Sequence, residues 1–206
     1  MNRPFARLAS SLILLVLGSA PAFAHHLMGG RTPATFADGL LSGLGHPVIG
    51  LDHFAAVVAV GCLAAAHRVA LAIGFVLAMM AGVALHLHGT TVPGTEILVA
   101  LSVIFLGLFM LRNRDVTAVT AFLLFAVVGL IHGYALGESI YGAEPTPLYA
   151  YLLGLAVIQG AIALAAVQIA RAVVRRPAVM SPLRLVGAGI AGIGLAALMQ
   201  QIIPGA

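Results

Sequence analysis

The chain has 206 residues, of which 62% are hydrophobic and only 8% are charged. A water-soluble domain carries roughly 25% charged residues, so this composition excludes a soluble globular protein. All ten basic residues are arginine, and they are spread between apolar segments instead of forming a stripe that could bind nucleic acid. We therefore expect an integral membrane protein whose surroundings are the lipid bilayer, with no nucleic-acid partner.

The first 24 residues have the three parts of a secretory signal peptide. Two arginines come first, an apolar stretch to Leu17 follows, and Ala22-Phe23-Ala24 supplies the small-x-small pattern that signal peptidase reads. We predict cleavage after Ala24, with an uncleaved anchor helix as the alternative. The mature chain, residues 25–206, would then begin with His25-His26, and metal binding by this pair is left open.

The mature chain contains six apolar segments near the length that crosses a hydrocarbon core of roughly 30 Å. Each is expected to be helical, because lipid offers no hydrogen-bond partners to the backbone. We therefore predict an all-α, polytopic membrane helical bundle with about six transmembrane helices, forming one domain. The segments are 47–66, 69–87, 96–111, 116–136, 147–170 and 183–203.

The arginines predict the orientation of these helices. If the mature amino terminus lies outside, every arginine of the mature chain except Arg31 falls in an inward linker, which is the positive-inside bias. The tyrosines fall at the opposite, outer boundary, where amphipathic rings prefer to lie. They are Tyr134, Tyr141, Tyr149 and Tyr151.

Small residues recur four positions apart in two of the segments. Gly74, Ala78 and Gly82 form one row, and Ala188 and Gly192 form another. Such rows let helices approach closely in lipid, so we predict tight helix packing along them. Association into a homo-oligomer is left open.

Nearly all ionisable side chains other than arginine fall near the outer ends of the predicted helices, and only His67 and Asp115 belong to the inner side. Ionisable groups at membrane depth are costly, so their gathering predicts a functional site. Imidazole and carboxylate ligands suit divalent nickel, cobalt, zinc or copper. The candidate metal ligands are His46, Asp52, His53, His86, His88, His132 and Glu138.

Spacing limits how these residues could share an ion. In a continuous helix His46 and His53 would share a face but stand about 10 Å apart along the axis, so they could bind one ion only if the chain bends, which Gly50 permits. Otherwise His46 would be an entry ligand, and Asp52 with His53 a deeper one. His86 and His88 would point to different faces unless their helix unwinds. Glu96 is either a further ligand or a carboxylate that complements its helix dipole.

A hydrogen-bonded polar cluster is the alternative to a metal site for Asp52, His53 and His132. Further in, Ser102 and Gln159 are the few polar candidates for an ion path, because the inner halves of the helices are almost wholly apolar.

Two motifs resemble those of the HupE/UreJ family. The segment HPVIGLDH, from His46 to His53, resembles the HPxxGxDH signature, and HGYALGE, from His132 to Glu138, resembles HGxAxGxE. The signal peptide and the order of the spans are similar as well. The resemblance implies nickel or cobalt uptake across a bacterial inner membrane, with the mature amino terminus in the periplasm. Many relatives carry further histidines where this chain has Tyr134, Leu136 and, in the fifth span, Gln159, so zinc and copper stay open as substrates.

We therefore predict a transition-metal permease or facilitator and not an enzyme. One alternative is an intramembrane metal-dependent hydrolase, in which Glu138 would be the base that activates a metal-bound water. Another is a haem-binding membrane subunit with His86 and His132 as axial ligands.

Overall fold

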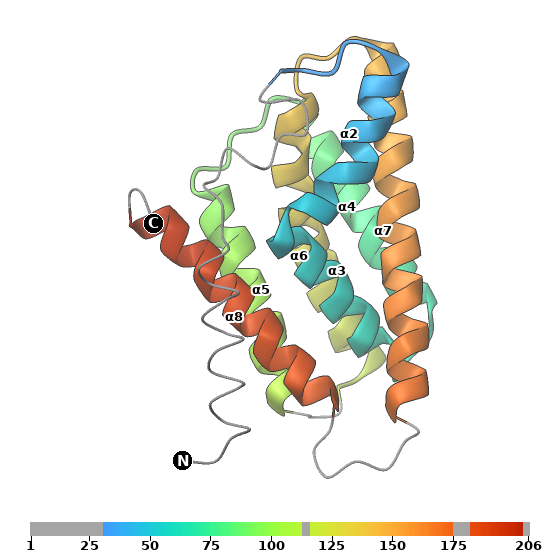
Figure 1. The fold of residues 1–206 in the computed structure, drawn as a ribbon, viewed down its shortest axis with the longest axis vertical. Helices are drawn as coiled ribbons and strands as arrows, with labels where there is room; N and C mark the ends of the chain where they lie inside the picture. Colours follow the sequence, from blue (N-terminus) through green and yellow to red (C-terminus); the bar gives the residue numbers. More distant parts are fainter. Residues whose placement is uncertain (1–30, 113–115, 175–181, 204–206) are drawn as a thin grey trace.

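The computed structural model describes residues 31–112, 116–174 and 182–203. Within this part every regular element is a helix (Figure 1), which confirms the predicted all-α, polytopic bundle. The predicted signal peptide, His25, His26, Arg114, Asp115, Arg175 and Arg176 lie outside the described residues. The elements are α2 (Phe36–Ile49), α3 (Leu51–Ala64), α4 (Ala70–Leu87), α5 (Thr95–Arg112), α6 (Ala118–Gly137), the 3-10 helix η2 (Glu138–Ile140), α7 (Pro145–Val174) and α8 (Pro182–Ile202).

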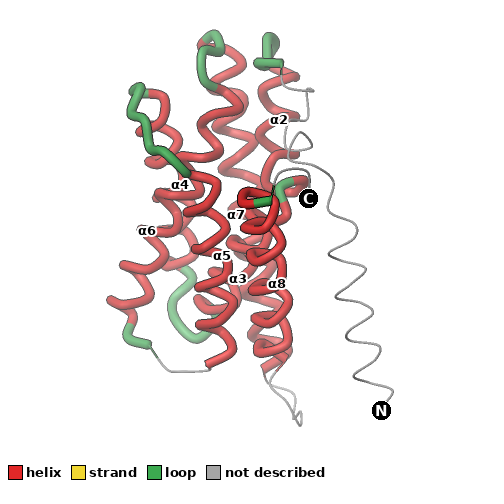
Figure 2. The backbone as a smooth tube through the Cα atoms, turned by 90° about the vertical axis from the view of Figure 1, so that its left-hand side faces the viewer, coloured by secondary structure: helices red, strands yellow, loops and turns green. Residues whose placement is uncertain are grey.

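The number of spans agrees with the prediction. Five described helices, α4 to α8, are long and apolar enough to cross a membrane, and α2 with α3 makes a sixth when the bent pair counts as one span. The bounds of α4, α5, α6 and α8 differ from the predicted segments by a few residues, whereas α7 extends to 145–174. The connecting loops lie at the ends of the bundle (Figure 2).

The first span differs from its prediction, because it begins earlier and is broken. Instead of one helix over 47–66, α2 begins at Phe36, and α3 follows it after a bend of 75°. The early start has a local cause. Thr35 and Asp38 form a capping box, in which each side chain accepts a hydrogen bond from the other residue's backbone N–H, at 3.1 and 3.0 Å.

The break follows from two residues in the first motif. Pro47 lies in the last turn of α2, and it has no backbone N–H to donate to the preceding turn. Gly50 then leaves the helical conformation, with φ −73° and ψ 95°. The chain therefore ends one helix and starts another within the motif, and the bend that Gly50 permits is present.

The broken span runs along α7 from one end of that helix to the other (Figure 1). Near the start of α2, Gly39 lies against the backbone of Pro147, and near the end of α3, Gly61 lies against Ala163. Both halves thus advance along α7 in the same direction. The pair is one crossing of the bundle in two pieces, and not a loop that returns to the same side.

Glycine contacts hold α4 against α6. Gly82 of α4 and Gly133 of α6 lie so close to the partner's backbone that a Cβ atom would collide with a carbonyl there. This close approach is the packing predicted for the first row of small residues. Gly74, in the same row, has only an ordinary contact, 4.0 Å from an added Cβ to a ring atom of Phe122.

The contact between α5 and α8 uses a different row from the predicted one. Gly187 and Gly194 of α8 face the backbone of α5 at close range. The predicted residues do not, since Ala188 is exposed and a Cβ added at Gly192 would meet nothing within 4 Å. The prediction was wrong because α8 is apolar on every side, so its sequence does not mark the face that packs.

Arginine side chains bind backbone carbonyls where α3 and α5 end. The guanidinium group of Arg171 donates to the carbonyls of Ala65 and His67, at 3.1 and 3.0 Å, and Arg184 donates to that of Leu111 at 3.0 Å. These two arginines thus mark the end of the bundle opposite to the start of α2. That this end faces the cytoplasm stays a prediction.

Candidate metal site

The break in the first span brings together the two histidines of the first motif. The ring centroids of His46 and His53 are 5.9 Å apart, with the ring planes at 79°. Both side chains are buried, as is Asp52 beside them. We call these three residues the bend cluster. A straight helix would have held the two histidines about 10 Å apart along its axis.

Asp52 occupies the first turn of α3, next to the break. Its Oδ1 accepts a hydrogen bond of 2.8 Å from the backbone N–H of His53. The first N–H groups of a helix lack partners within the helix, and they carry the positive end of its dipole. The carboxylate is therefore held at the start of α3, between the two histidines in sequence and close to the bend.

A third histidine reaches the cluster from α6. His132 is wholly buried, and its Nδ1 lies 3.0 Å from Nδ1 of His53. Its other ring nitrogen, Nε2, lies 2.8 Å from the hydroxyl oxygen of Ser102 on α5. From the sequence, Ser102 was expected only as a polar residue of an ion path deeper in the membrane. In the structure its hydroxyl contacts His132 directly.

His46 has a polar neighbour that sequence reasoning missed. Its Nδ1 lies 3.1 Å from Oγ of Ser139, in η2, and that Oγ lies 3.0 Å from the hydroxyl of Tyr151 on α7. Tyr151 in turn donates to the carbonyl of Leu136 at 2.7 Å. The position of Ser139 directly after the second motif was the one signal in the sequence that could have identified it.

Two of the four tyrosines predicted at the lipid boundary are buried inside the bundle. Tyr151 is fully buried, and Tyr134 is nearly so, while Tyr141 and Tyr149 are exposed. The hydroxyl groups of both buried tyrosines form hydrogen bonds with other segments of the chain. Tyr134 donates to the carbonyl of Thr90 and accepts from the backbone N–H of Val92, which fixes the loop between α4 and α5.

The other predicted ligands lie outside the bend cluster. His86, at the end of α4, packs against the rings of Tyr134 and Tyr141, with centroids 4.6 and 5.6 Å away. His88 is the exposed C-cap residue of α4, and Glu138 is exposed at the start of η2. His86 packs against Tyr134 and Tyr141, whereas His132 contacts His53 and Ser102. This arrangement does not favour a haem with His86 and His132 as its two axial ligands.

One further carboxylate interacts electrostatically with the bend cluster. Glu96, at the start of α5, is half-buried and lies within electrostatic range of Asp52 and Glu138. In the part of the chain that the structure describes, however, no three His, Cys, Asp or Glu side chains are arranged to hold one ion as they stand. The ligand set therefore stays a prediction, and an ion would have to draw the side chains of the bend cluster together.

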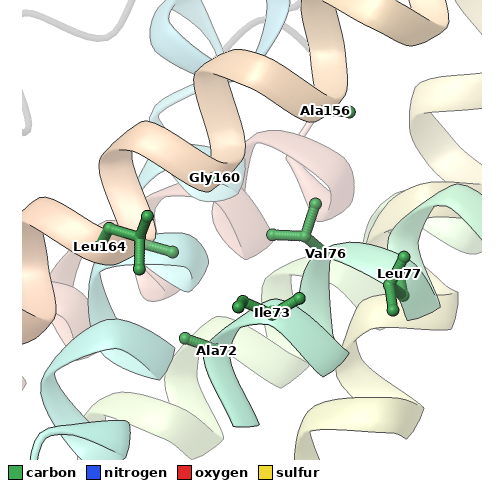
Figure 3. Close-up of a pocket in the computed structure, with 8 residues that line it drawn as sticks. Ala72, Ile73, Val76, Leu77, Ala156, Gly160 and Leu164 are labelled. Atoms are coloured by element: carbon green, nitrogen blue, oxygen red, sulfur yellow. The ribbon is translucent and has the colours of Figure 1, made fainter. Parts of the chain in front are cut away.

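A cavity of about 170 Å³ between α4 and α7 is a different kind of site (Figure 3). Its lining is aliphatic or glycine, as Ile73, Val76, Gly160 and Leu164 illustrate. Metal ions need nitrogen, oxygen or sulfur ligands, and these side chains offer none. The bend cluster is therefore the stronger candidate.

Comparison with known proteins agrees with the two motifs. The sequence matches the family model described as HupE / UreJ protein over residues 13–197. It is similar to "Protein HupE" of Rhizobium leguminosarum bv. viciae, with 32% identity over 137 residues, which are 65% of this chain and 68% of the relative. No solved structure matches the chain. Because the family model covers most of the sequence, the chain belongs to the HupE/UreJ family.

Proposed function

We propose that this protein is a permease or facilitator that takes up nickel or cobalt ions from the periplasm through the bend cluster. Membership of the HupE/UreJ family supports a role related to nickel or cobalt transport. One observation supports the bend cluster as the site of uptake, namely that the first span is broken. The break brings the ring centroids of His46 and His53 to 5.9 Å from each other, beside Asp52.

The chemistry of this cluster suits the proposed substrates. Two imidazoles and a carboxylate form the kind of nitrogen and oxygen ligand set that binds nickel and cobalt, and zinc and copper also accept it. The one cysteine, Cys62, is buried two turns or more further along α3, so the cluster itself contains no thiolate. The substrate is therefore a divalent transition-metal cation that accepts nitrogen and oxygen ligands. The geometry of the ligands then selects among nickel, cobalt, zinc and copper.

A broken helix is also a suitable place for an ion to pass. In many transporters, discontinuous helices put half-helix ends and unwound backbone beside the substrate near the middle of the membrane. Here the end of α2 and the start of α3 meet at Gly50, inside the bundle. Ser102 and Gln159, both buried, supply polar groups on α5 and α7 that the ion could meet beyond the cluster.

The proposed orientation follows from the two ends of the bundle. The arginines that bind the ends of α3 and α5 mark one end, and the positive-inside bias assigns that end to the cytoplasm. The start of α2 then faces the periplasm of a bacterial cell, and the bend cluster is reached from there.

The proposal is tested by uptake of radioactive nickel into cells that express the protein. His53→Ala and Asp52→Asn should abolish uptake and weaken nickel binding by at least about 100-fold, since even residues that only support metal ligands cost 10- to 100-fold. Membrane abundance, measured by immunoblot, should stay close to that of the parent protein.

His67→Ala is the matched control, because His67 lies in the turn after α3 at the arginine end of the bundle. It should transport nearly as well as the parent. Equal loss of uptake from His67→Ala and His53→Ala would contradict a site at the bend. Normal uptake by His53→Ala would exclude that site altogether.

A further inference from the structure

A basic hollow lies at the arginine end of the bundle, opposite to the start of α2. It has a volume of about 410 Å³, and it is lined by Ala66, His67, Arg68, Ala70, Leu71 and Ala118. These residues belong to the turn after α3, the start of α4 and the start of α6. A cavity needs only roughly 10–15 Å³ to hold one water molecule, so the basic hollow has room for a much larger group.

The basic hollow lies where two membrane spans begin. Ala70 is the first residue of α4, Ala118 is the first residue of α6, and both helices are long and apolar enough to cross the bilayer. The hollow therefore falls at the depth of the phospholipid head groups, between the hydrocarbon core and the water. This placement needs only that the arginine end lies at a membrane surface, and it does not depend on which surface that is.

Arg68 supplies a positive charge that no other described residue uses. The guanidinium groups of Arg171 and Arg184 donate to backbone carbonyls, which commits them to the fold. By contrast, the Arg68 side chain is exposed, and no hydrogen bond or ion pair joins it to another described residue. A guanidinium group presents a planar fork of N–H donors that fits two oxygens of a phosphate. Arg68 can therefore bind a phosphate group without breaking a contact of the fold.

The backbone adds donors to the same hollow. The first N–H groups of a helix have no acceptor within the helix, and they carry the positive end of its dipole. At the start of α4, the N-cap residue Val69 offers no side-chain acceptor. At the start of α6, Thr117 accepts from the N–H of Thr120, which leaves that of Ala118 uncapped. Residues 112–115, which lead into α6, carry two arginines and one aspartate, so they add no net negative charge.

We propose that the basic hollow binds the phosphate group of an acidic phospholipid, with the guanidinium group of Arg68 as its main contact. A free phosphate ion shares this chemistry, but the position at the start of two spans favours a lipid. The acyl chains of a lipid stay in the bilayer while its phosphate reaches Arg68. Basic pockets between transmembrane helices bind acidic head groups in this way. This site goes beyond the proposed function, because it lies apart from the bend cluster and needs no metal ion.

Native mass spectrometry of the whole purified protein tests the proposal by counting bound lipids. The parent protein should bind one molecule of phosphatidylglycerol more tightly than phosphatidylcholine, which has no net charge. Arg68→Gln should weaken the binding of phosphatidylglycerol about fivefold, the contribution of one arginine near a membrane surface. Arg112→Gln is the matched control and should bind as the parent does, because Arg112 is exposed at the end of α5 and does not line the hollow.

A second pair of variants keeps every charge. Ala118→Phe should fill the basic hollow and weaken the binding of phosphatidylglycerol, whereas Val119→Phe, at the next and well exposed position, should leave it unchanged. Inorganic phosphate at the same concentration should not displace the lipid, and displacement would mean a site for a free anion and overturn the proposal. Equal affinity for the two lipids would overturn it as well, as would equal weakening in Arg68→Gln and Arg112→Gln, or unchanged binding by Ala118→Phe.

Discussion

At the scale of single residues, Gln159 is the polar side chain whose presence most needs an explanation. It is fully buried in α7, and neither its amide oxygen nor its amide nitrogen has a hydrogen-bond partner among the described residues. It lies on the same row of α7 as Leu155 and Ala163, which contact Gly43 of α2 and Gly61 of α3. Gln159 therefore faces the broken span between those two contacts, on the path that we propose for the ion.

The prediction for Gln159 separates its effect on stability from its effect on transport. An unpaired buried polar group costs about 1–3 kcal/mol, so Gln159→Leu should raise the free energy of unfolding by about that amount and increase the thermal unfolding temperature in detergent. Nickel uptake should fall, because the path loses a polar group. Gln168→Leu, at an exposed position of the same helix, should change neither quantity. A less stable Gln159→Leu protein would show that the amide has a partner.

The residues of the two motifs were predictable from sequence, but their neighbours were not. His46, Asp52 and His53 stand out because ionisable groups are costly at membrane depth. Ser139 and Tyr151 do not, since a serine and a tyrosine near a helix end are common. Their roles depend on which helices meet, and this information comes only from the fold.

At the scale of elements, the break at Gly50 brings His46 and His53 together, whereas a continuous helix would hold them apart. The sequence permitted a bend at Gly50 without requiring one, and the structure has a bend of 75° there. It did not indicate that the helix begins at Phe36, because the segment before His46 has modest hydropathy and several glycines. The pair Thr35 and Asp38 was the available signal, since a hydroxyl followed three residues later by a carboxylate marks a helix start.

A side chain at Gly50 would press on the bend cluster. An added Cβ would lie 3.0 Å from Cδ2 of His53 and 3.3 Å from the carbonyl oxygen of His46, so the ring of His53 would have to shift. We expect Gly50→Ala to weaken nickel binding on the order of 10- to 100-fold, as loss of support for a ligand does. Gly192→Ala is the control, because a Cβ there meets nothing within 4 Å. Equal nickel affinity in the two variants, measured by titration calorimetry, would show that the cluster does not depend on the shape of the break.

At the scale of the whole molecule, the number of spans was predictable and the way they pack was not. An apolar segment must be about twenty residues long to cross the bilayer, so its length alone identifies a span. Which face packs against a neighbour is much less visible in lipid, because both faces are apolar. Hence α8 uses Gly187 and Gly194 for its contact with α5, and not the predicted Ala188 and Gly192.

The assembled bundle brings together residues that are far apart in the chain. His53 and His132 meet across α3 and α6, and His46 meets Ser139 between α2 and η2. The bend cluster is therefore supported from several helices, on the side of the bundle away from Arg171 and its carbonyl partners.

In the proposed site, the two halves of the broken span hold one ion between them. A double-mutant cycle of His46→Asn and His53→Asn tests it most directly, with nickel affinity measured by titration calorimetry on the four purified proteins. Asparagine leaves an oxygen ligand, so the single variants should keep measurable affinity. Residues that act as a unit are strongly non-additive, so the double variant should bind nickel scarcely more weakly than the weaker single variant. Free-energy losses that add within about 0.5 kcal/mol would mean that His46 and His53 act independently, and would contradict a shared site.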